Sequence, residues 1–235
     1  MQEHVVVVGG SSGMGRALAT ELVAQGSEVT VAGRTPAKLE AVRRELGVRT
    51  VQLDLANEHD IERLFATTGR ISHLVTTAAD VGGAYQPIIE YDVNAARSAV
   101  DSKLLGPLLL AKHGAPVLEP GGSIVFTSGI AAYRPGPRAS LLAALNGALA
   151  SLAAALAVEL APLRVNVVSP GWVDTPIWQD VAGDAASATL AAMADRLPVG
   201  RIGRPQDIAA AIIALLRNGF ITGTVLHADG GHRLV

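Results

Sequence analysis

The stretch HVVVVGGSSGMG at residues 4–15 decides the fold, because a short apolar run leads straight into a cluster of glycines. His4–Val8 is rich in valine, as expected for a strand that is covered on both faces. A helical pattern begins at about residue 13. The glycine spacing, G-x3-G-x-G, suits a sharp turn that brings bare backbone N–H groups to an anion at the start of a helix. The stretch therefore predicts a phosphate-binding loop of Gly9, Ser11, Ser12, Gly13, Met14 and Gly15. The other interpretation is a glycine turn that only joins strand to helix.

Short apolar runs alternate with longer helical patterns along the rest of the chain. The predicted strands are His4–Val8, Glu28–Ala32, Val48–Leu53, Ile71–Thr76, Ser123–Thr127, Arg164–Val168 and Thr224–His227. The predicted helices are 13–25, 36–46, 57–66, 87–114, 138–161 and 205–218. This order, without linker or repeat, predicts a single domain, 1–235, of the α/β class: a Rossmann-like, doubly wound, seven-stranded parallel sheet with helices on both faces. Residues 176–198 interrupt the alternation and are predicted to form a lid or substrate lobe.

Composition excludes several classes of function. The 235 residues are 49% hydrophobic and 17% charged, so the chain can bury a sizeable core. Nineteen basic residues against 21 acidic ones give a net charge of −2, and no basic block exists to follow a nucleic acid backbone. The absence of cysteine excludes disulfides, thiolate metal sites and cysteine nucleophiles. The six histidines show no metal-ligand spacing, so we expect no metal.

One uncharged stretch, 139–158, has the length of a membrane span. It is mostly alanine and includes Asn146 and Gly147, so a helix buried on more than one side is the better interpretation. The N-terminus lacks the basic region and the long apolar core of a signal peptide. We therefore expect a cytoplasmic protein without a membrane partner.

The glycine loop resembles that of the short-chain dehydrogenase/reductase family, which reads T-G-x3-G-x-G, although Val8 replaces the usual threonine. Further matches follow in the same order: LDLAN at 53–57, RVNVVSPGWVDTP at 164–176 and ITGTVLHADGG at 221–231. The resemblance implies a nicotinamide dinucleotide cofactor. It places Asp54 and Leu55 near the adenine, Val173 at the carboxamide and Thr175 at a phosphate.

The end of the second predicted strand indicates which dinucleotide is bound. An acidic residue there would bind the ribose 2′-hydroxyl, whereas an arginine suits a 2′-phosphate. Here Gly33 stands at the position of the acid and Arg34 follows it. A guanidinium can hold a phosphate bidentately, so the sequence favours NADP(H) over NAD(H). The other interpretation of Arg34 is an ordinary solvated side chain on a loop.

The catalytic positions depart from the family pattern, in which a serine, a tyrosine and a lysine four residues after it act with an asparagine on a neighbouring helix. Ser128 in IVFTSGIAA matches the serine. Counting back from ALAVELAPLRVN puts Leu142 at the tyrosine position and Asn146 at the lysine position. TTAA at 76–79 stands where the family has Asn-Asn-Ala-Gly. Leucine cannot transfer a proton, so orthodox catalysis needs a replacement.

Two residues are candidates for that replacement. Lys103 stands where the helix asparagine is expected, so that the lysine and asparagine are exchanged between 103 and 146. Tyr133 lies five residues after Ser128 and could turn a phenol inward. The plainer interpretations are a helix lysine with its ammonium in water and a tyrosine that packs a loop. Trp172 and Trp178 either wall a substrate pocket or pack under the lid.

The sequence favours an NADP(H)-dependent oxidoreductase that acts on a small carbonyl or alcohol through a non-standard active site. The alternatives are an NADP(H)-binding sensor or regulator that has lost catalysis, and a non-catalytic partner subunit. In the family the long helix mediates dimerisation, so the resemblance implies a homodimer or homotetramer through 138–161. The sequence names neither the substrate nor the direction of hydride transfer.

Overall fold

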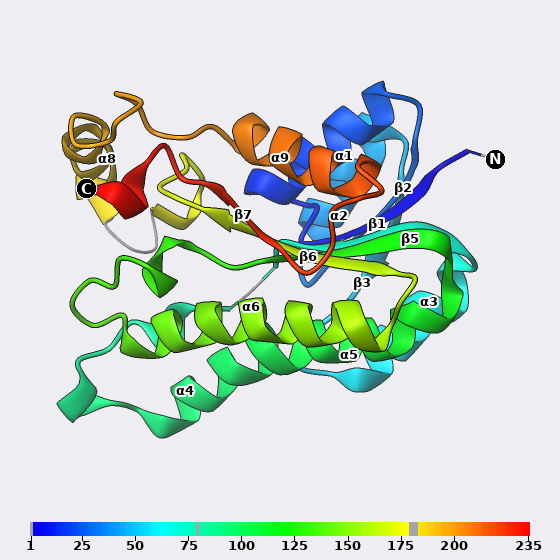
Figure 1. The fold of residues 1–235 in the computed structure, drawn as a ribbon, viewed down its shortest axis with the longest axis horizontal. Coiled ribbons are helices and arrows are strands. Elements are labelled where there is room, and N and C mark those ends of the chain that lie inside the picture. The colour runs from blue at the N-terminus through cyan, green and yellow to red at the C-terminus, as the bar shows by residue number, and fades with distance from the viewer. Residues whose placement is uncertain (1, 79, 179–182) are drawn as a thin grey trace.

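Seven strands form one parallel sheet in the order β3-β2-β1-β4-β5-β6-β7. The computed structural model describes residues 2–78, 80–178 and 183–235. The strands are β1 (His4–Val8), β2 (Glu28–Gly33), β3 (Arg49–Gln52), β4 (Ile71–Thr76), β5 (Leu118–Thr127), β6 (Arg164–Pro170) and β7 (Val225–Ala228). Figure 1 shows the sheet between two helical layers, and this confirms the predicted doubly wound α/β fold.

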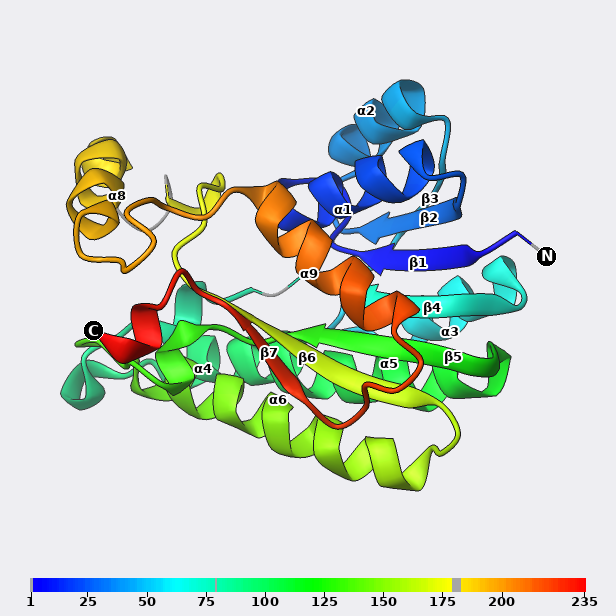
Figure 2. The same ribbon diagram turned by 45° about the horizontal axis from the view of Figure 1, so that its top comes forward.

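The described helices lie on both sides of the sheet. They are α1 (Gly13–Ala24), α2 (Pro36–Leu46), α3 (Glu58–Thr68), α4 (Val93–Val100), α5 (Gly106–Gly114), α6 (Ser140–Glu159), α8 (Ala186–Ala194) and α9 (Pro205–Arg217). Figure 2 shows α1, α2 and α9 over one face and α3, α5 and α6 over the other. The right-handed crossovers of parallel strands produce this arrangement.

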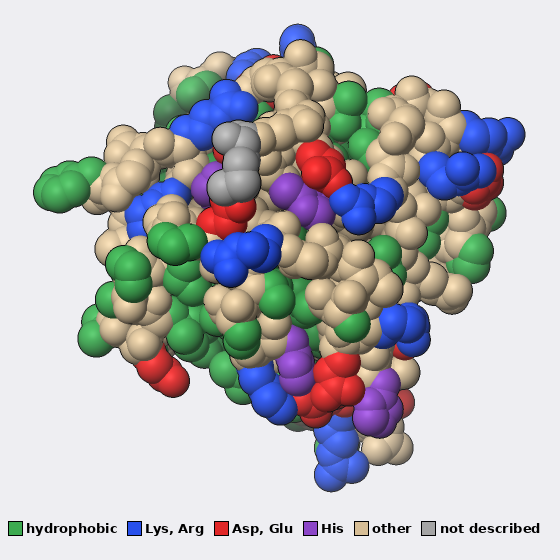
Figure 3. Space-filling model, turned by 90° about the vertical axis from the view of Figure 1, so that its right-hand side faces the viewer, with side chains coloured by type: hydrophobic (Ala, Val, Ile, Leu, Met, Phe, Trp, Pro, Cys, Tyr) green, Lys and Arg blue, Asp and Glu red, His purple; other side chains and the backbone are tan. Residues whose placement is uncertain are grey.

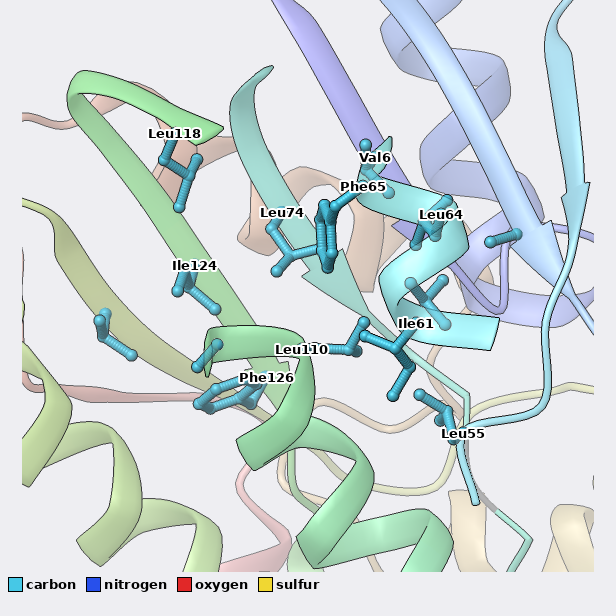
Figure 4. Close-up of a cluster of buried hydrophobic side chains, with 14 of the residues drawn as sticks. Val6, Leu55, Ile61, Leu64, Phe65, Leu74, Leu110, Leu118, Ile124 and Phe126 are labelled. Carbon is cyan, nitrogen blue, oxygen red and sulfur yellow. The ribbon is translucent and has the colours of Figure 1, made fainter. Parts of the chain in front are cut away.

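Two apolar cores follow from the period-2 alternation of side chains along each strand. In β1, Val5 and Val7 face the core under α1 and α9, whereas Val6 and Val8 face the core under α3, α5 and α6. All four valines are fully buried. Figure 4 shows the second core, in which Phe65 from α3, Leu110 from α5 and Phe126 from β5 surround the middle of the sheet. Aliphatic packing on both faces holds the strand ends in place, and the site is built at those ends.

The edge of the sheet where the strands begin carries buried polar groups. Figure 3 views the molecule from this side and shows histidines beside acidic side chains. The buried His73 has a polar neighbour at each ring nitrogen. Ser123 Oγ is 2.9 Å from Nδ1, and Glu3 Oε1 is 3.2 Å from Nε2. Burial lowers the pKa of His73 below its usual value, although the Glu3 carboxylate acts in the opposite direction. The imidazole is therefore held mainly in its neutral form.

The predicted helix 87–114 is wrong as a single element. The chain forms a 3-10 turn at Ile88–Glu90 and then α4, whose first backbone N–H groups are capped by the Asp92 carboxylate. A π-helical segment, Asp101–Leu105, then joins α4 to α5. Such one-turn bulges are frequent at functional sites, and they leave no signature in hydrophobic periodicity. Here the bulge sets the orientation of Lys103.

Helix α6 passes a test of length and composition for a membrane span, as core helices of soluble proteins also do. One of its faces packs against the sheet through Leu149, Ala153 and Leu156. The opposite face is open, and Val158 is 81% exposed. The uncharged stretch in the sequence therefore reflects a helix that covers the sheet.

The predicted lid, 176–198, is described only in part, because residues 179–182 lie outside the described chain. Its described part contains a 3-10 turn at Gly183–Ala185 and α8. Figures 1 and 2 show α8 beyond the carboxyl ends of the strands, close to the C-terminus of the chain. The segment therefore lies at the same end of the molecule as the glycine loop.

Candidate active site

A cavity of about 320 Å³ opens at the carboxyl ends of the strands, where the sheet order reverses between β1 and β4. This is the place where doubly wound sheets bind their ligands. The residues predicted to bind the cofactor gather around it, with the exception of Val173: Gly9, Ser11, Ser12, Gly13, Met14, Gly15, Arg34, Asp54, Leu55 and Thr175 all line the cavity. Their contacts with a cofactor remain predictions.

The glycine loop is shaped by close backbone approach. Gly9 has φ +89°, a conformation that side-chain-bearing residues rarely adopt. A Cβ on Gly15 would lie 2.3 Å from the carbonyl oxygen of Gly9 and 2.4 Å from Thr77 Oγ1. Ser12 precedes α1 without a side-chain cap hydrogen bond, and the first turn of the helix holds no acidic residue. The N-terminal amides of α1 are thus available to an anion, and a dinucleotide fits this cradle.

The part of the cavity where the sequence predicts the adenosine carries three charged side chains, Arg34, Lys38 and Asp80. Arg34 follows β2 and donates from a guanidinium nitrogen to Asp80 Oδ2 at 2.9 Å. This hydrogen bond holds the pKa of the Asp80 carboxyl below its usual value. Lys38, in the first turn of α2, lines the same cavity, four residues after Arg34. Sequence reasoning missed both Lys38 and Asp80. Lys38 could have been found because it lies close to Arg34 in the chain, at the start of α2, whereas Asp80 comes from a separate loop.

A second cavity of about 210 Å³ adjoins the first and shares Met14, Thr77, Thr175 and Ile177 with it. Of the predicted cofactor-binding and catalytic residues that do not line the first cavity, Lys103, Ser128 and Val173 line this second one. Leu142 and Asn146, at the positions predicted for the missing tyrosine and lysine, line it as well. The second cavity thus brings together the residues at which the sequence predicts departures from the family pattern, next to the first cavity.

Lys103 is the charged group of this cavity. Its side chain is buried, and Nζ donates one hydrogen bond, at 3.3 Å, to the carbonyl oxygen of Thr127. Burial lowers the pKa of Lys103 to about 8. An ammonium in these surroundings can lose and regain a proton near neutral pH, as a general acid–base catalyst must. This placement opposes the plain interpretation of a solvated helix lysine.

Ser128 and Asn146 lie next to each other at the end of β5. The Ser128 hydroxyl donates to the backbone carbonyl of Asn146 at 3.0 Å. The Asn146 side chain is 2% exposed, and its Oδ1 accepts no hydrogen bond from the described residues. A buried amide oxygen without a donor costs free energy, so Asn146 is suited to accept from a bound ligand.

Tyr133 is not brought to either cavity. Its side chain is 40% exposed, and its ring meets that of His227 edge-on at 4.5 Å. Tyr133 follows the 3-10 turn Ile130–Ala132. The exposed side chain and its contact with His227 favour the interpretation of a packing residue.

The segment after β6 closes the second cavity. Trp178 Nε1 donates to the carbonyl oxygen of Val173 at 2.8 Å, which fixes the indole. The rings of Trp172 and Trp178 lie 4.4 Å apart at an interplanar angle of 36°. Tyr85, from the loop after β4, lines the cavity too and was missed in the sequence, since nothing in its surroundings marks it. Ala79, the last residue of the TTAA motif, lies outside the described chain.

One group of side chains has the spacing of a metal site, contrary to the expectation from the sequence. Glu58, Glu62 and His113 place ligand atoms within 4.8 Å of one another, because α3 packs beside α5. The Lys112 ammonium lies 2.6 Å from Glu58 Oε1, and His113 Nε2 lies 2.8 Å from the same oxygen. This ammonium already neutralises the carboxylate that a cation would need.

Comparison with known proteins decides the family. The model described as enoyl-(acyl carrier protein) reductase matches residues 8–233. The short-chain dehydrogenase/reductase malC of Malbranchea aurantiaca is 33% identical and covers 97% of this chain and 94% of its own length. The chain belongs to the short-chain dehydrogenase/reductase family. It is similar over its whole length to human 3-oxoacyl-[acyl-carrier-protein] reductase, at 31% identity.

Solved structures of other short-chain dehydrogenases/reductases superpose on this one. A small-chain dehydrogenase in complex with NADPH is 35% identical, covers both chains completely and gives a TM-score of 0.86. The MalC reductase/Diels-Alderase from Malbranchea aurantiaca is 32% identical, covers 100% of this chain and 96% of its own, and gives a TM-score of 0.92. This short-chain dehydrogenase/reductase therefore has the fold of an oxidoreductase family.

Proposed function

We propose that this short-chain dehydrogenase/reductase is an NADP(H)-dependent oxidoreductase that interconverts a small carbonyl compound and its alcohol, with Lys103 as the proton donor and acceptor. The observation that carries the proposal is the buried Lys103 ammonium in a cavity that adjoins the dinucleotide cleft. When bound, the nicotinamide supplies or accepts the hydride.

The charges at the adenosine end support NADP(H). Arg34 and Lys38 both line the cleft where the 2′-phosphate would lie, and Gly33 offers no carboxylate. A guanidinium–phosphate contact contributes about 1.5–3 kcal/mol, because it is charge-assisted and can be bidentate. Asp80 competes for Arg34, so the net preference is smaller than the contact itself. The similarity to a dehydrogenase solved with NADPH agrees with this choice.

The substitutions at the catalytic positions support the role of Lys103. Leu142 has no ionisable group, and Asn146 carries no charge with which to activate a neighbour. Both line the cavity that contains Lys103. In the direction of reduction, the ammonium donates its proton to the carbonyl oxygen. Ser128 orients that oxygen once its hydroxyl proton turns from the Asn146 carbonyl to the substrate. In the direction of oxidation, the neutral amine accepts the proton from the alcohol.

The experiment is a search for turnover with a deuterium label. Purified protein is incubated with NADPH carrying deuterium at C4 and a panel of small ketones and aldehydes, and the products are analysed by mass spectrometry. We expect at least one alcohol one mass unit heavier than its unlabelled form. Saturable NADPH binding without product from any panel member would contradict the oxidoreductase proposal. It would favour an NADP(H)-binding sensor, which the leucine at position 142 also supports.

A further inference from the structure

We infer that the substrate is a carbonyl compound built on a single planar, conjugated ring and without positive charge, which stacks on Trp178 with its oxygen toward Lys103 and Ser128. The inference rests on the proposed function, and it adds a class of substrate that the site would select. It is drawn from the distribution of side chains around the second cavity.

The aromatic residues of the chain are concentrated at this cavity. The sequence has three Phe, two Trp and three Tyr, and both tryptophans and one tyrosine, Tyr85, line these walls. The two cores on the faces of the sheet are aliphatic except for Phe65 and Phe126. Large flat faces at one small cavity suit a flat ligand, because aromatic rings gain energy from offset or edge-on contact beyond simple burial.

Trp178 presents the face on which a ring can stack. Trp172 has Trp178 on one side at 4.4 Å, and the ring of His232 meets it edge-on at 6.2 Å. Among the described residues, Trp178 has no second ring against it. Its Nε1 hydrogen bond to the Val173 carbonyl holds the indole in place before any ligand arrives. A preorganised surface loses little entropy on binding, which favours a rigid partner over a flexible chain.

The polar groups of the cavity come from other elements than the tryptophans. Lys103 comes from the π-helical segment, Ser128 follows β5 and Asn146 lies on α6. Trp172 and Trp178, in contrast, follow β6. A ligand with one polar end and one flat apolar end matches this division. The carbonyl oxygen meets the ammonium and the hydroxyl, and the ring meets the indole.

The charge of Lys103 and the volume of the cavity limit the class of substrate further. A protonated Lys103 in a buried site repels a cation strongly and tolerates or attracts an anion. The volume of about 210 Å³ falls below the roughly 300–1,000 Å³ of sites for drug-sized ligands, and the nicotinamide would take part of it. One ring is therefore the size that fits.

Binding can be measured without turnover. With the protein saturated by NADP⁺, a ketone forms a dead-end complex, and quenching of tryptophan fluorescence reports its binding because both tryptophans line the cavity. We would titrate acetophenone, its saturated counterpart cyclohexyl methyl ketone, 4-acetylbenzoate and the 4-acetylphenyl-trimethylammonium ion. We expect acetophenone to bind about two- to tenfold more tightly than the saturated ketone, from the gain on aromatic contact. We also expect the ammonium compound to bind weakest of the four.

Two variants separate stacking from simple burial. Trp178→Leu keeps an apolar side chain but removes the planar indole ring, so it should abolish the preference for acetophenone over cyclohexyl methyl ketone. The fluorescence of Trp172 still reports binding in this variant. Phe220→Leu is the matched control, because Phe220 is fully exposed and lines neither cavity. It should keep the wild-type ranking.

Equal or tighter binding of the saturated ketone, tightest binding of the ammonium compound, or an unchanged ranking in Trp178→Leu would overturn the inference. The wild-type ranking tests it even if Trp178→Leu does not fold. Titration with NADP⁺ alone comes first and tests the proposed function separately. If that cofactor does not bind, the proposed function fails, and the same ketone ranking in the cofactor-free protein still tests the cavity.

Discussion

At the scale of single residues, the main feature is the buried Lys103, which the sequence analysis predicts to stand where the family has an asparagine. A charged group in an apolar cavity lowers stability unless it is paired, and Lys103 has one carbonyl partner among the described residues. The burial of this lysine is more easily explained by a role in catalysis than by a role in packing. Replacement of Lys103 by methionine should therefore leave the protein folded and can even stabilise it.

We expect Lys103→Met to lower turnover by about 10²–10⁴-fold, the usual contribution of general acid–base catalysis. Because the pKa of Lys103 is lowered to about 8, the ammonium predominates below that pH and the neutral amine above it. Steady-state rates of ketone reduction should fall as the pH rises through 8, and rates of alcohol oxidation should rise. Lys112→Met, an exposed lysine on α5, is the control. Unchanged activity in Lys103→Met, or no inflection near pH 8, would exclude this role.

At the scale of elements, the β1–loop–α1 unit depends on the absence of a side chain at Gly15. A methyl group there would overlap the Gly9 carbonyl and the Thr77 hydroxyl. We expect Gly15→Ala to lower the free energy of unfolding by about 1–3 kcal/mol and to abolish measurable NADPH binding. Urea unfolding and cofactor titration check both effects.

Gly147→Ala on α6 is the matched control for this substitution. A Cβ at Gly147 meets nothing within 4 Å, and its helical backbone suits alanine. It should raise stability by about 0.4–1 kcal/mol. A Gly15→Ala protein as stable as wild type, with wild-type NADPH affinity, would contradict the structure of the loop.

The sequence predicts the helices and strands better than it predicts the contacts between distant segments. The apolar runs located all seven strands, because the inner parallel strands are covered on both faces, and the glycine spacing located the first cavity. The break at residues 101–105 was missed, since a π turn keeps the apolar pattern of a helix. The Arg34–Asp80 pair was missed as well, because it joins loops 46 residues apart that only the sheet order brings together.

At the scale of the whole molecule, stability should depend on histidines that are buried or partly buried. Burial lowers the pKa of His73, His227 and His232 below 6.5, so at mildly acidic pH the unfolded chain binds protons that the native chain does not. The free energy of unfolding therefore carries no penalty from these histidines above pH 6.5. It decreases as the pH falls from 6.5 toward the lowered pKa values of the native protein. Urea unfolding should show this fall, and His73→Gln should make it shallower. A stability that rises on acidification from pH 7 to 5.5 would contradict the assignment.

The open face of α6 predicts self-association, as the sequence did. Val158 on this helix is 81% exposed, and Leu105, just before α5, and Leu108, on α5, are 42% and 40% exposed. We expect light scattering to give the mass of a homodimer or homotetramer, and Val158→Glu to shift it toward the monomer because it places a charge on the apolar face. Phe220→Ser should leave the mass unchanged. A wild-type protein that is monomeric at micromolar concentration would contradict the prediction of an interface on α6.

Calorimetric titration of the wild-type protein with NADPH and with NADH tests the central claim most directly. The amides at the start of α1 should bind the pyrophosphate of either cofactor, while Arg34 and Lys38 add a contact only to the 2′-phosphate. We expect NADPH to bind about tenfold more tightly or better, and Arg34→Ala to remove most of that difference. Tighter binding of NADH, or no heat from either dinucleotide at millimolar concentration, would contradict the account.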